Sequence, residues 1–303
     1  MSDIKLFRAT NNKVEELQGR SATIEKSLQA RIEQNMEEFL GIRFLASEYS
    51  TGKEHGGRID SLGLDENGCP VIIEYKRTQN ENVINQGLFY LDWLMEHKAD
   101  FKLLVLDKFG KDDADTIEFS SPRLLCIAGD FTKYDEHAVK QINRNIELIR
   151  YRLFGDDLLL LELVNATSVA TNPIAEEQPL KAKRKDKTAA EYLGQAPQNL
   201  RDLYDELSTY LIALGDDVQF KQLKFYFAYK RIKNFACVEI HPQSGRLLVY
   251  VKVNPDSISL EQGFSRDVRN IGHFGTGDLE LSLTSMADFE KAKPLLMSSY
   301  EAS

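Results

Sequence analysis

Apolar residues recur along the first half of the chain with two periods, one typical of helices and one typical of strands. Between residues 23 and 41, one face of a predicted helix has an apolar residue at every fourth position: Ile24, Leu28, Ile32, Met36 and Leu40. Gly41 is expected to end this helix. Helical spacing also predicts helices over residues 82–97 and 135–151.

Shorter apolar runs between these helices predict strands. We expect these strands at residues 4–9, 44–49, 101–107, 123–129 and 158–164, with a loop at residues 52–57. Two more runs flank Asp65-Glu66-Asn67-Gly68, which favours a tight turn, so residues 58–77 are predicted to form a β-hairpin. The alternation indicates an α/β domain with a mixed sheet flanked by helices.

Residues 166–198 interrupt this pattern. This stretch has few large apolar residues, three prolines and a basic run that includes Lys183 and Arg184, so we expect a flexible, solvated basic linker. A basic linker can also contact phosphate groups. Beyond it, a helix, three β-rich runs, a Gly-rich loop and a closing helix capped by Ser285 predict a smaller α+β domain. The predicted domains are therefore 1–165 and 199–303.

Length and composition agree with two domains. The chain has 303 residues, of which 42% are hydrophobic, and no run approaches the roughly 18 apolar residues that span a bilayer. The N-terminus lacks the apolar segment of a secretory signal. The three cysteines are far apart and odd in number, which is typical of reduced thiols, so we expect a cytoplasmic protein. A net charge of −9 means that binding to nucleic acid would need a local basic surface.

The predicted hairpin carries charged side chains among its apolar residues. Asp60 lies on the first strand, and Glu74 and Lys76 lie on the second. Side chains alternate between the two faces of a strand, so Glu74 and Lys76 point the same way. The turn is centred near residue 67, the mean of 60 and 74, so the two carboxylates are expected to be cross-strand neighbours. Neighbouring carboxylates destabilise a sheet unless a cation lies between them, and hard oxygen ligands suit Mg²⁺ or Mn²⁺.

Asp60, thirteen intervening residues and Glu74-x-Lys76 resemble the PD-(D/E)XK signature of a superfamily of Mg²⁺-dependent nucleases. More narrowly, residues 24–105 are similar to the catalytic domain of the mismatch-cleaving endonucleases in that superfamily. The segments that carry this similarity are IEKSLQ, FLASEY, GRIDSLG, PVIIEYKR and INQGLFYL. Ile59 stands where the signature has its proline. The resemblance implies a restriction-endonuclease-like fold.

The resemblance also implies roles for single residues. Glu25, Asp60 and Glu74 would be metal ligands, Lys76 the motif lysine and Gln86 the glutamine on the following helix. The implied cofactor is Mg²⁺ or Mn²⁺, and the implied reaction is hydrolysis of phosphodiester bonds in nucleic acid, DNA in particular. From the residues alone, an acidic residue at position 25 is also explained by the dipole of the first helix. Asn85, the residue before Gln86, is the competing candidate for the polar side chain on that helix.

Other side chains are candidates for contact with nucleic acid: His55, Arg58, Lys230, Arg231 and Lys233. The last three alternate with aromatic residues, as in surfaces that stack single-stranded bases. A strand with core aromatics and solvated lysines has the same composition, and we favour that interpretation. For His55, the alternative to contact with nucleic acid is a histidine that is simply exposed in a loop.

The second domain resembles a bacterial domain of unassigned function, through AYKRIKNFACVEIH and RDVRNIGHFGTGDLE. This resemblance implies no activity. The chain is therefore predicted to be a Mg²⁺-dependent nuclease, and the alternative is a catalytically inactive nuclease fold that binds or scaffolds a partner. RNA as the substrate and a homodimer are left open, and no membrane partner is expected.

Overall fold

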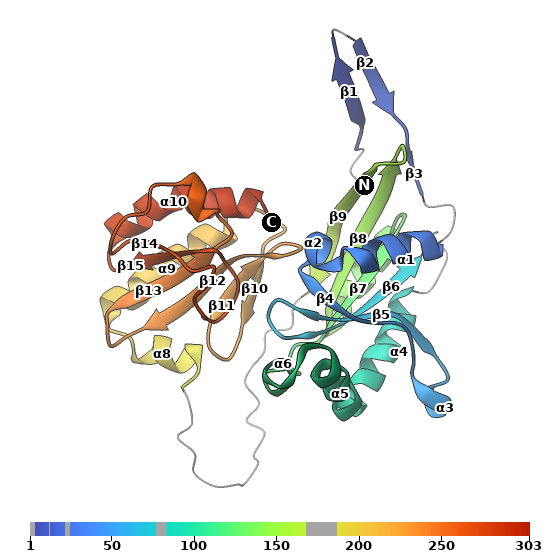
Figure 1. Ribbon diagram of the computed structural model, residues 1–303, viewed down its shortest axis with the longest axis horizontal. Coiled ribbons are helices and arrows are strands. Elements are labelled where there is room, and N and C mark those ends of the chain that lie inside the picture. The colour runs from blue at the N-terminus through green and yellow to red at the C-terminus, as the bar shows by residue number, and fades with distance from the viewer. Residues whose placement is uncertain (1–3, 12, 22–24, 77–82, 168–186) are drawn as a thin grey trace. The chain divides into compact units, whose positions relative to one another are not determined.

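The computed structural model of the protein describes residues 4–11, 13–21, 25–76, 83–167 and 187–303 (Figure 1). The chain divides into two compact units, Met1–Val169 and Ala170–Ser303, and each has its own sheet. Of the predicted linker, residues 168–186 lie outside the described residues. Residues 189–195 form a helix of the second unit, so the predicted linker extends too far at its C-terminal end.

Seven of the described strands form the mixed sheet of the first unit, in the order β3-β8-β7-β6-β5-β4, with β9 paired to β8 (Figure 1). They are β3 (Gly19–Arg20), β4 (Ile42–Ser50), β5 (Arg58–Asp65), β6 (Pro70–Lys76), β7 (Arg123–Ala128), β8 (Asn145–Phe154) and β9 (Leu158–Thr167). Strands β6, β7 and β8 are parallel, and the remaining pairs are antiparallel. The predicted hairpin 58–77 is the β5–β6 pair.

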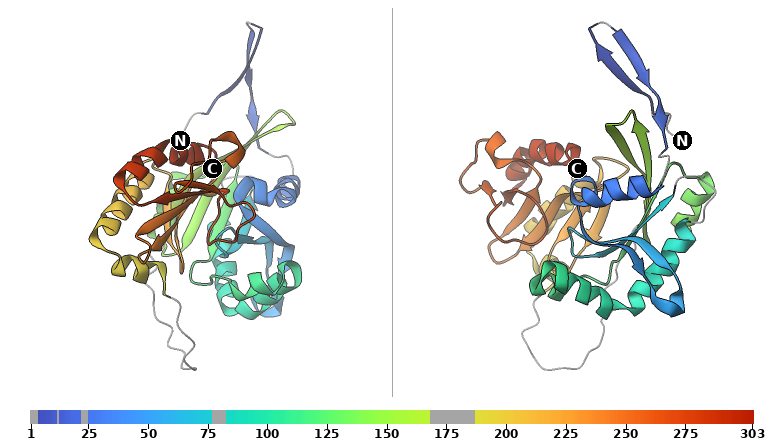
Figure 2. Two further views of the ribbon diagram at one scale, coloured as in Figure 1. Left: turned by 60° about the vertical axis from the view of Figure 1, so that its left-hand side comes forward. Right: turned by 45° about the vertical axis from the view of Figure 1, so that its right-hand side comes forward.

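Helices cover both faces of this sheet (Figure 2). One face of β5 and β6 packs with residues of the helices α4 (Val83–Glu96), α5 (Lys98–Phe109) and α7 (Lys133–Gln141) in one core. The other face meets α1 (Glu25–Gln34), which is followed by α2 (Met36–Leu40). The predicted first helix is thus broken at Asn35, and it ends at Gly41, whose φ of +64° suits glycine.

Three predictions for the first unit are wrong. Residues 101–107 belong to the helix α5, because a short apolar run has no period that separates a strand from a helix. Residues 52–55 form the short helix α3 (Gly52–His55) in the predicted loop. The predicted helix 135–151 is α7 followed by β8, a strand that is buried over most of its length and pairs with β7 and β9. The short helix α6 (Lys111–Asp115) follows α5.

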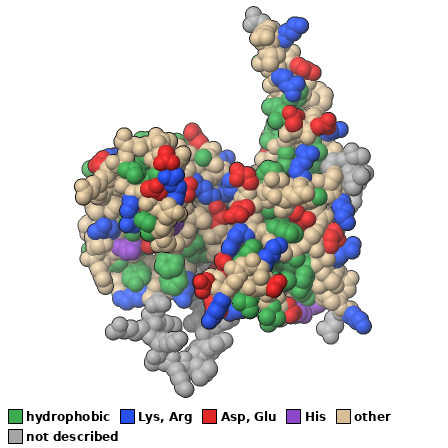
Figure 3. Space-filling model, viewed as in Figure 1, with side chains coloured by type: hydrophobic (Ala, Val, Ile, Leu, Met, Phe, Trp, Pro, Cys, Tyr) green, Lys and Arg blue, Asp and Glu red, His purple; other side chains and the backbone are tan. Residues whose placement is uncertain are grey.

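A separate hairpin, β1 (Leu6–Thr10) and β2 (Lys13–Leu17), precedes this sheet (Figure 1). Its residues are almost all exposed, and they include the apolar side chains of Phe7 and Val14, which are 51% and 69% exposed. Charged side chains of both signs lie among them (Figure 3). The strand predicted at residues 4–9 is part of this hairpin.

The second unit has one antiparallel sheet and three described α-helices. Its strand order is β10-β11-β12-β13-β15-β14. The strands are β10 (Gln219–Gln222), β11 (Phe227–Lys230), β12 (Asn234–His241), β13 (Arg246–Val251), β14 (Ser265–Asp267) and β15 (Leu279–Leu283). The helices are α8 (Ala189–Gln195), α9 (Gln198–Ile212) and α10 (Met286–Glu301), with a 3₁₀ turn at Pro255–Ser257.

The core of the second unit lies between one face of this sheet and the helices. Leu207 of α9 and Leu296 of α10 pack there with Val238 and Leu281 of the sheet, and all four are fully buried. Ser285 caps α10 as predicted, because its side chain accepts a hydrogen bond from the backbone N of Asp288. None of the described helices has the length and hydropathy needed to cross a membrane.

Candidate active site

The register of the motif hairpin brings Asp60 and Glu74 together. Ser61 lies opposite Ile73 in the β5–β6 pair, which places Asp60 opposite Glu74. Oε1 of Glu74 accepts a hydrogen bond from the backbone N of Asp60 at 3.2 Å, and Oδ2 of Asp60 accepts one from the backbone N of Tyr75 at 3.0 Å. Each carboxylate is therefore held against the backbone of the other strand. The two side chains are neighbours as predicted, and their role as metal ligands stays a prediction.

Negative charge is concentrated at this point of the sheet. Glu74 is fully buried, and Asp60 is half-buried. Burial raises the pKa of the Cys126 thiol, which lies beside Glu74 on β7, and the charge of Glu74 raises it further. Burial likewise raises the pKa of Tyr75, with smaller upward contributions from Glu33, Asp60 and Glu74. The carboxylate charges of Asp60 and Glu74 therefore lie among buried groups of β6 and β7.

Helix α1 is tied to the site by a polar network. Nε2 of Gln29 donates to the backbone O of Asp60 at 2.9 Å and to Oε1 of Glu33 at 3.0 Å. Ser61 donates to the same Glu33 oxygen at 2.6 Å. Sequence reasoning missed these residues, although a polar pair four residues apart on an otherwise apolar helix face is a usable signal. Glu25 begins α1 one turn before Gln29, and its side chain lies outside the described residues.

Strand β4 flanks the site with a strained residue. Ser47 pairs with Ser61 and Tyr49 pairs with Ile59, so Glu48 lies opposite Asp60. Glu48 has a φ of +52°, which is uncommon for a residue with a side chain. Its Oε2 accepts from Nε of Arg58 at 2.6 Å, and the Arg58 side chain is 67% exposed. Strained backbone of this kind clusters at functional sites.

The other motif residues lie at the end of β6 and on α4. Lys76 is the last residue of β6, it is half-buried, and it follows Glu74 by two residues on the same face. Gln86 on α4 is half-buried and donates from Nε2 to the hydroxyl of Tyr90 at 3.4 Å, whereas the competing Asn85 is exposed. The same hydroxyl accepts from the backbone N of Arg58 at 3.1 Å. The glutamine is therefore linked to the start of the strand that carries Asp60.

His55 does not lie in an exposed loop. It belongs to α3, its side chain is 17% exposed, and its ring packs 5.2 Å from that of Phe89 and 5.7 Å from that of His97. Its Nε2 lies 3.7 Å from Oε2 of Glu96. These contacts assign it a structural role in an aromatic cluster at one end of α4.

The candidate cations of the second unit are largely committed to its own structure. Lys230 is 1% exposed, which argues against a contact with nucleic acid. Nε of Arg231 donates to Asp217 at 2.6 Å, and its guanidinium lies over the ring of Tyr300. Lys233 is half-buried in the following turn. The neighbouring aromatic residues of β11 and β12 belong to the core, as we favoured, but the expectation of solvated lysines is wrong for Lys230, which is buried.

Among the residues that the structure describes, no group of three or more His, Cys, Asp and Glu side chains is arranged to hold a metal ion. The candidate donors on the sheet are the pair Asp60 and Glu74, and the side chain of Glu25 lies outside the described residues. Two adjacent carboxylates fit Mg²⁺ or Mn²⁺, which prefer oxygen ligands and commonly keep several waters.

Comparison with known proteins gives one family match in the second unit and one relative along nearly the whole chain. Residues 188–303 match the model of a family described as a domain of unknown function, DUF5655. Nearly the whole chain is similar to an uncharacterised protein from Haemophilus influenzae, with 27% identity over 304 residues, 97% of this chain and 98% of that relative.

Two solved structures resemble part of the chain. One is a repair endonuclease from Pyrococcus abyssi, with 18% identity, a TM-score of 0.29 and coverage of 43% of this chain and 47% of that one. The other is an EndoMS–dsDNA2 complex, with 21% identity, a TM-score of 0.25 and coverage of 47% and 49%. The matched region spans about half the length of each of those chains.

Proposed function

We propose that the first unit is a divalent-metal-dependent nuclease that hydrolyses phosphodiester bonds, with DNA as its substrate. The observation that carries this proposal is the pairing of Asp60 and Glu74 across β5 and β6, with Lys76 two residues further on the same strand face. The spacing of these three residues resembles the PD-(D/E)XK signature. DNA is proposed because residues 24–105 resemble the mismatch-cleaving endonucleases of that superfamily.

Asp60 and Glu74 would hold Mg²⁺ or Mn²⁺, with Glu25 as a third candidate ligand. Bound there, the ion would polarise the scissile phosphate and lower the pKa of the attacking water. Both carboxylates are hydrogen-bonded to backbone N–H groups of the facing strand, so their oxygens are positioned before any ligand arrives. This preorganisation is what a site for phosphoryl chemistry requires.

The remaining motif residues have roles that follow from their charge and position. The ammonium group of Lys76 would stabilise the negative charge that develops on the phosphoryl oxygens. Gln86, held through Tyr90 near the start of β5, would orient the attacking water. Glu48 and Arg58 form an ion pair on the edge of this region, where an exposed guanidinium can meet the nucleic-acid backbone.

The test uses the full chain with single-stranded DNA, double-stranded DNA and RNA, in Mg²⁺, in Mn²⁺ and in EDTA. We expect cleavage of DNA only when an ion is present. Asp60→Asn, Glu74→Gln and Lys76→Ala should each slow it by about a hundredfold or more, because each removes a group that acts on the transition state. Asp92→Asn, at an exposed carboxylate of α4, is the matched control and should keep full activity.

Ion binding measured by calorimetry separates the roles of these residues. Lys76→Ala should still bind Mn²⁺, whereas Glu74→Gln should not. Undiminished cleavage by Glu74→Gln would overturn the assignment of the site. A wild-type chain that neither binds the ion nor cleaves any substrate would instead support a nuclease fold that binds a partner without chemistry. Cleavage of RNA alone would correct the substrate.

A further inference from the structure

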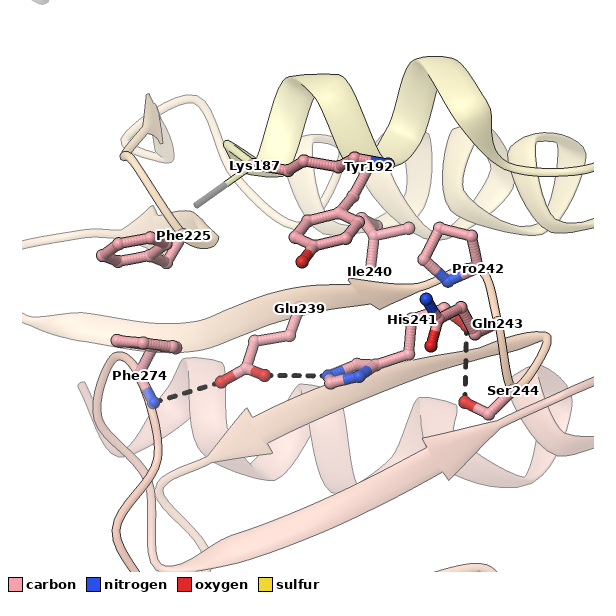
Figure 4. Close-up of a pocket in the computed structure, with 10 residues that line it drawn as sticks. All are labelled: Lys187, Tyr192, Phe225, Glu239, Ile240, His241, Pro242, Gln243, Ser244 and Phe274. Atoms are coloured by element: carbon pink, nitrogen blue, oxygen red, sulfur yellow. Dashed lines mark hydrogen bonds and ion pairs between the residues drawn. The ribbon is translucent and has the colours of Figure 1, made fainter. Parts of the chain in front are cut away.

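A second candidate site lies in the C-terminal unit, at the end of β12. Strand β11 begins at Phe227, opposite Val238, so Glu239 to His241 extend beyond β11 on that side. A cavity of about 510 Å³ lies there, lined by residues of α8, of the turn after β12 and of the loop that carries Phe274 (Figure 4). This volume is within the range of small-molecule sites.

Aromatic rings form two sides of the cavity. The rings of Phe225 and Phe274 are stacked, with centroids 4.5 Å apart and planes 25° apart. Tyr192 of α8 points into the cavity from another side (Figure 4). Phe274 is 49% exposed, although an aromatic ring of that size is normally buried. Two cations lie at the edge, since Lys187 lines the cavity and Nζ of Lys224 lies 4.6 Å from the Phe225 ring.

A buried carboxylate lies on the side of the cavity that carries Phe274 (Figure 4). Glu239 is 8% exposed, its Oε1 accepts from the backbone N of Phe274 at 3.1 Å, and its Oε2 lies 2.9 Å from Nε2 of His241 (Figure 4). These contacts fix the plane of the carboxylate. Each oxygen has a second lone pair, so Glu239 can still accept hydrogen bonds from a ligand.

The loop that carries Phe274 is fastened to β12. Gly275 has a φ of +77°, and a Cβ there would lie 2.6 Å from Cβ of Cys237, so the backbone is pressed against the strand. The backbone N of Thr276 donates to Sγ of Cys237 at 3.4 Å, and Nδ2 of Asn234 donates to Oγ1 of Thr276 at 3.3 Å. The aromatic side of the cavity is therefore formed in advance, which reduces the ordering cost of binding.

We propose that this cavity binds a nucleobase, and that guanine fits it best. Flat rings stack on aromatic side chains, and an acceptor-only carboxylate requires donors on the ring edge. Guanine presents two adjacent N–H donors on its Watson–Crick edge, which match the two oxygens of Glu239. Adenine and cytosine place a ring acceptor beside their single amino group, and uracil and thymine flank their one N–H with carbonyl oxygens.

The charges around the cavity favour a nucleotide over a cationic ligand. Lys187 lines the cavity and Lys224 lies at its edge, so an ammonium ligand would meet like charge there. A phosphate group attached to the base would instead be attracted to the two lysines. The base can come from a free nucleotide or from a single strand of nucleic acid, and both present the same chemistry.

The test is calorimetric titration of the full chain with GMP, AMP, CMP and UMP in EDTA, which keeps the first unit inactive. We expect GMP to bind and the other nucleotides to bind at least tenfold more weakly. A thymine oligonucleotide with one central guanine, compared with an all-thymine strand, identifies the source. Tighter binding of this strand than of GMP indicates a base within a strand, and weaker binding indicates a free nucleotide.

Two variants test the contacts. Glu239→Gln should weaken GMP binding by about tenfold or more and reduce the preference for guanine. Phe225→Ala should weaken all bases by about tenfold through lost stacking, and it keeps the proposal testable if Glu239→Gln does not fold. Glu261→Gln and Phe220→Ala, at exposed positions of the same unit, are the matched controls. Asp60→Asn should bind GMP normally, which separates this site from the proposed nuclease.

Any of three results would overturn the proposal. The first is no binding of any nucleotide at millimolar concentration. The second is equal binding of all four, which would show attraction to phosphate alone. The third is unchanged GMP binding in both Glu239→Gln and Phe225→Ala. Preferential binding of tetramethylammonium would reassign the cavity to a cationic ligand and would equally overturn it.

Discussion

The two sheets present their carboxylates in different ways. Glu74 lies inside a sheet that helices cover on both faces, and Asp60 reaches it through the register of a single hairpin. Glu239 lies on the sheet face opposite the core of its unit, and the loop that holds it in place, at Phe274, is 35 residues away in the chain. Residues of one hairpin are neighbours through their spacing alone, whereas a strand and a distant loop meet only through tertiary packing.

Arg123→Ala is the substitution that we expect to destabilise the sheet of the first unit most. Arg123 is 2% exposed and donates to Asp65 at 2.8 Å and to both oxygens of Glu147 at 2.7 and 2.8 Å. Burial disfavours its charge, but the two carboxylates outweigh this effect and raise its pKa. Its removal leaves two buried carboxylates, so we expect a loss of about 3–5 kcal/mol in the free energy of unfolding.

Urea denaturation followed by the fluorescence of Trp93, the single tryptophan of the chain, measures this loss in the first unit. Arg20→Ala is the control. Its partner Asp156 is almost fully exposed, so a change below about 1 kcal/mol is expected. Equal effects of the two arginine substitutions would contradict a structural role for the buried network.

One added methyl group should displace the loop of the second unit that carries Phe274. Gly275 and Gly245 both have positive φ, +77° and +61°, but only a Cβ at Gly275 would meet Cys237. We expect Gly245→Ala to cost about 1 kcal/mol from backbone strain. Gly275→Ala should cost about 1–3 kcal/mol more because of the clash, and it should weaken GMP binding. Thermal unfolding and calorimetry measure both effects, and equal losses at the two positions would argue against the fastened loop.

The smallest expected effect is a pH dependence confined to the second unit. Oδ2 of Asp288 accepts from the backbone N and the hydroxyl of Thr284 at 2.9 and 2.7 Å and from Ser285 at 3.0 Å. Burial raises the pKa of Asp288, but these hydrogen bonds outweigh burial and lower it. A depressed folded-state pKa gives stability that is present above the unfolded value, about 3.9, and is lost as the pH falls through the folded value.

Asp288→Asn removes this contribution. The midpoint of thermal unfolding of the second unit should be lower in the variant at pH 7, by the equivalent of about 1 kcal/mol or less. The two chains should converge as the pH falls below the unfolded value toward the lower folded value. A difference that grows on acidification would contradict the assigned direction.

The parts predicted from sequence are those with a local cause. The turn Asp65–Gly68 sets the hairpin register, and the spacing of apolar residues sets α4, so the neighbourhood of Asp60 and Glu74 follows from the chain itself. The ligand role of these carboxylates stays a prediction.

The parts that were missed depend on tertiary packing. In α5 only Phe101 and Val105 are buried, while Leu103 is 61% exposed, so its run of apolar residues has the composition of a strand and the packing of a helix. The burial of Lys230 is likewise invisible in a pattern of alternating aromatics and cations. The cavity beside Glu239 depends on the late start of β11, at Phe227, and on a distant loop, and neither has a sequence motif.

All three cysteines of the chain are buried thiols outside any disulfide, and one of them, Cys237, accepts the hydrogen bond that fastens the loop. Because thiol-specific dyes react with accessible thiolates, the folded protein should have little background labelling. A single cysteine introduced at Ser244, beside the aromatic cavity, would therefore carry a fluorophore at one defined position. Its emission could follow the arrival of a ligand in real time.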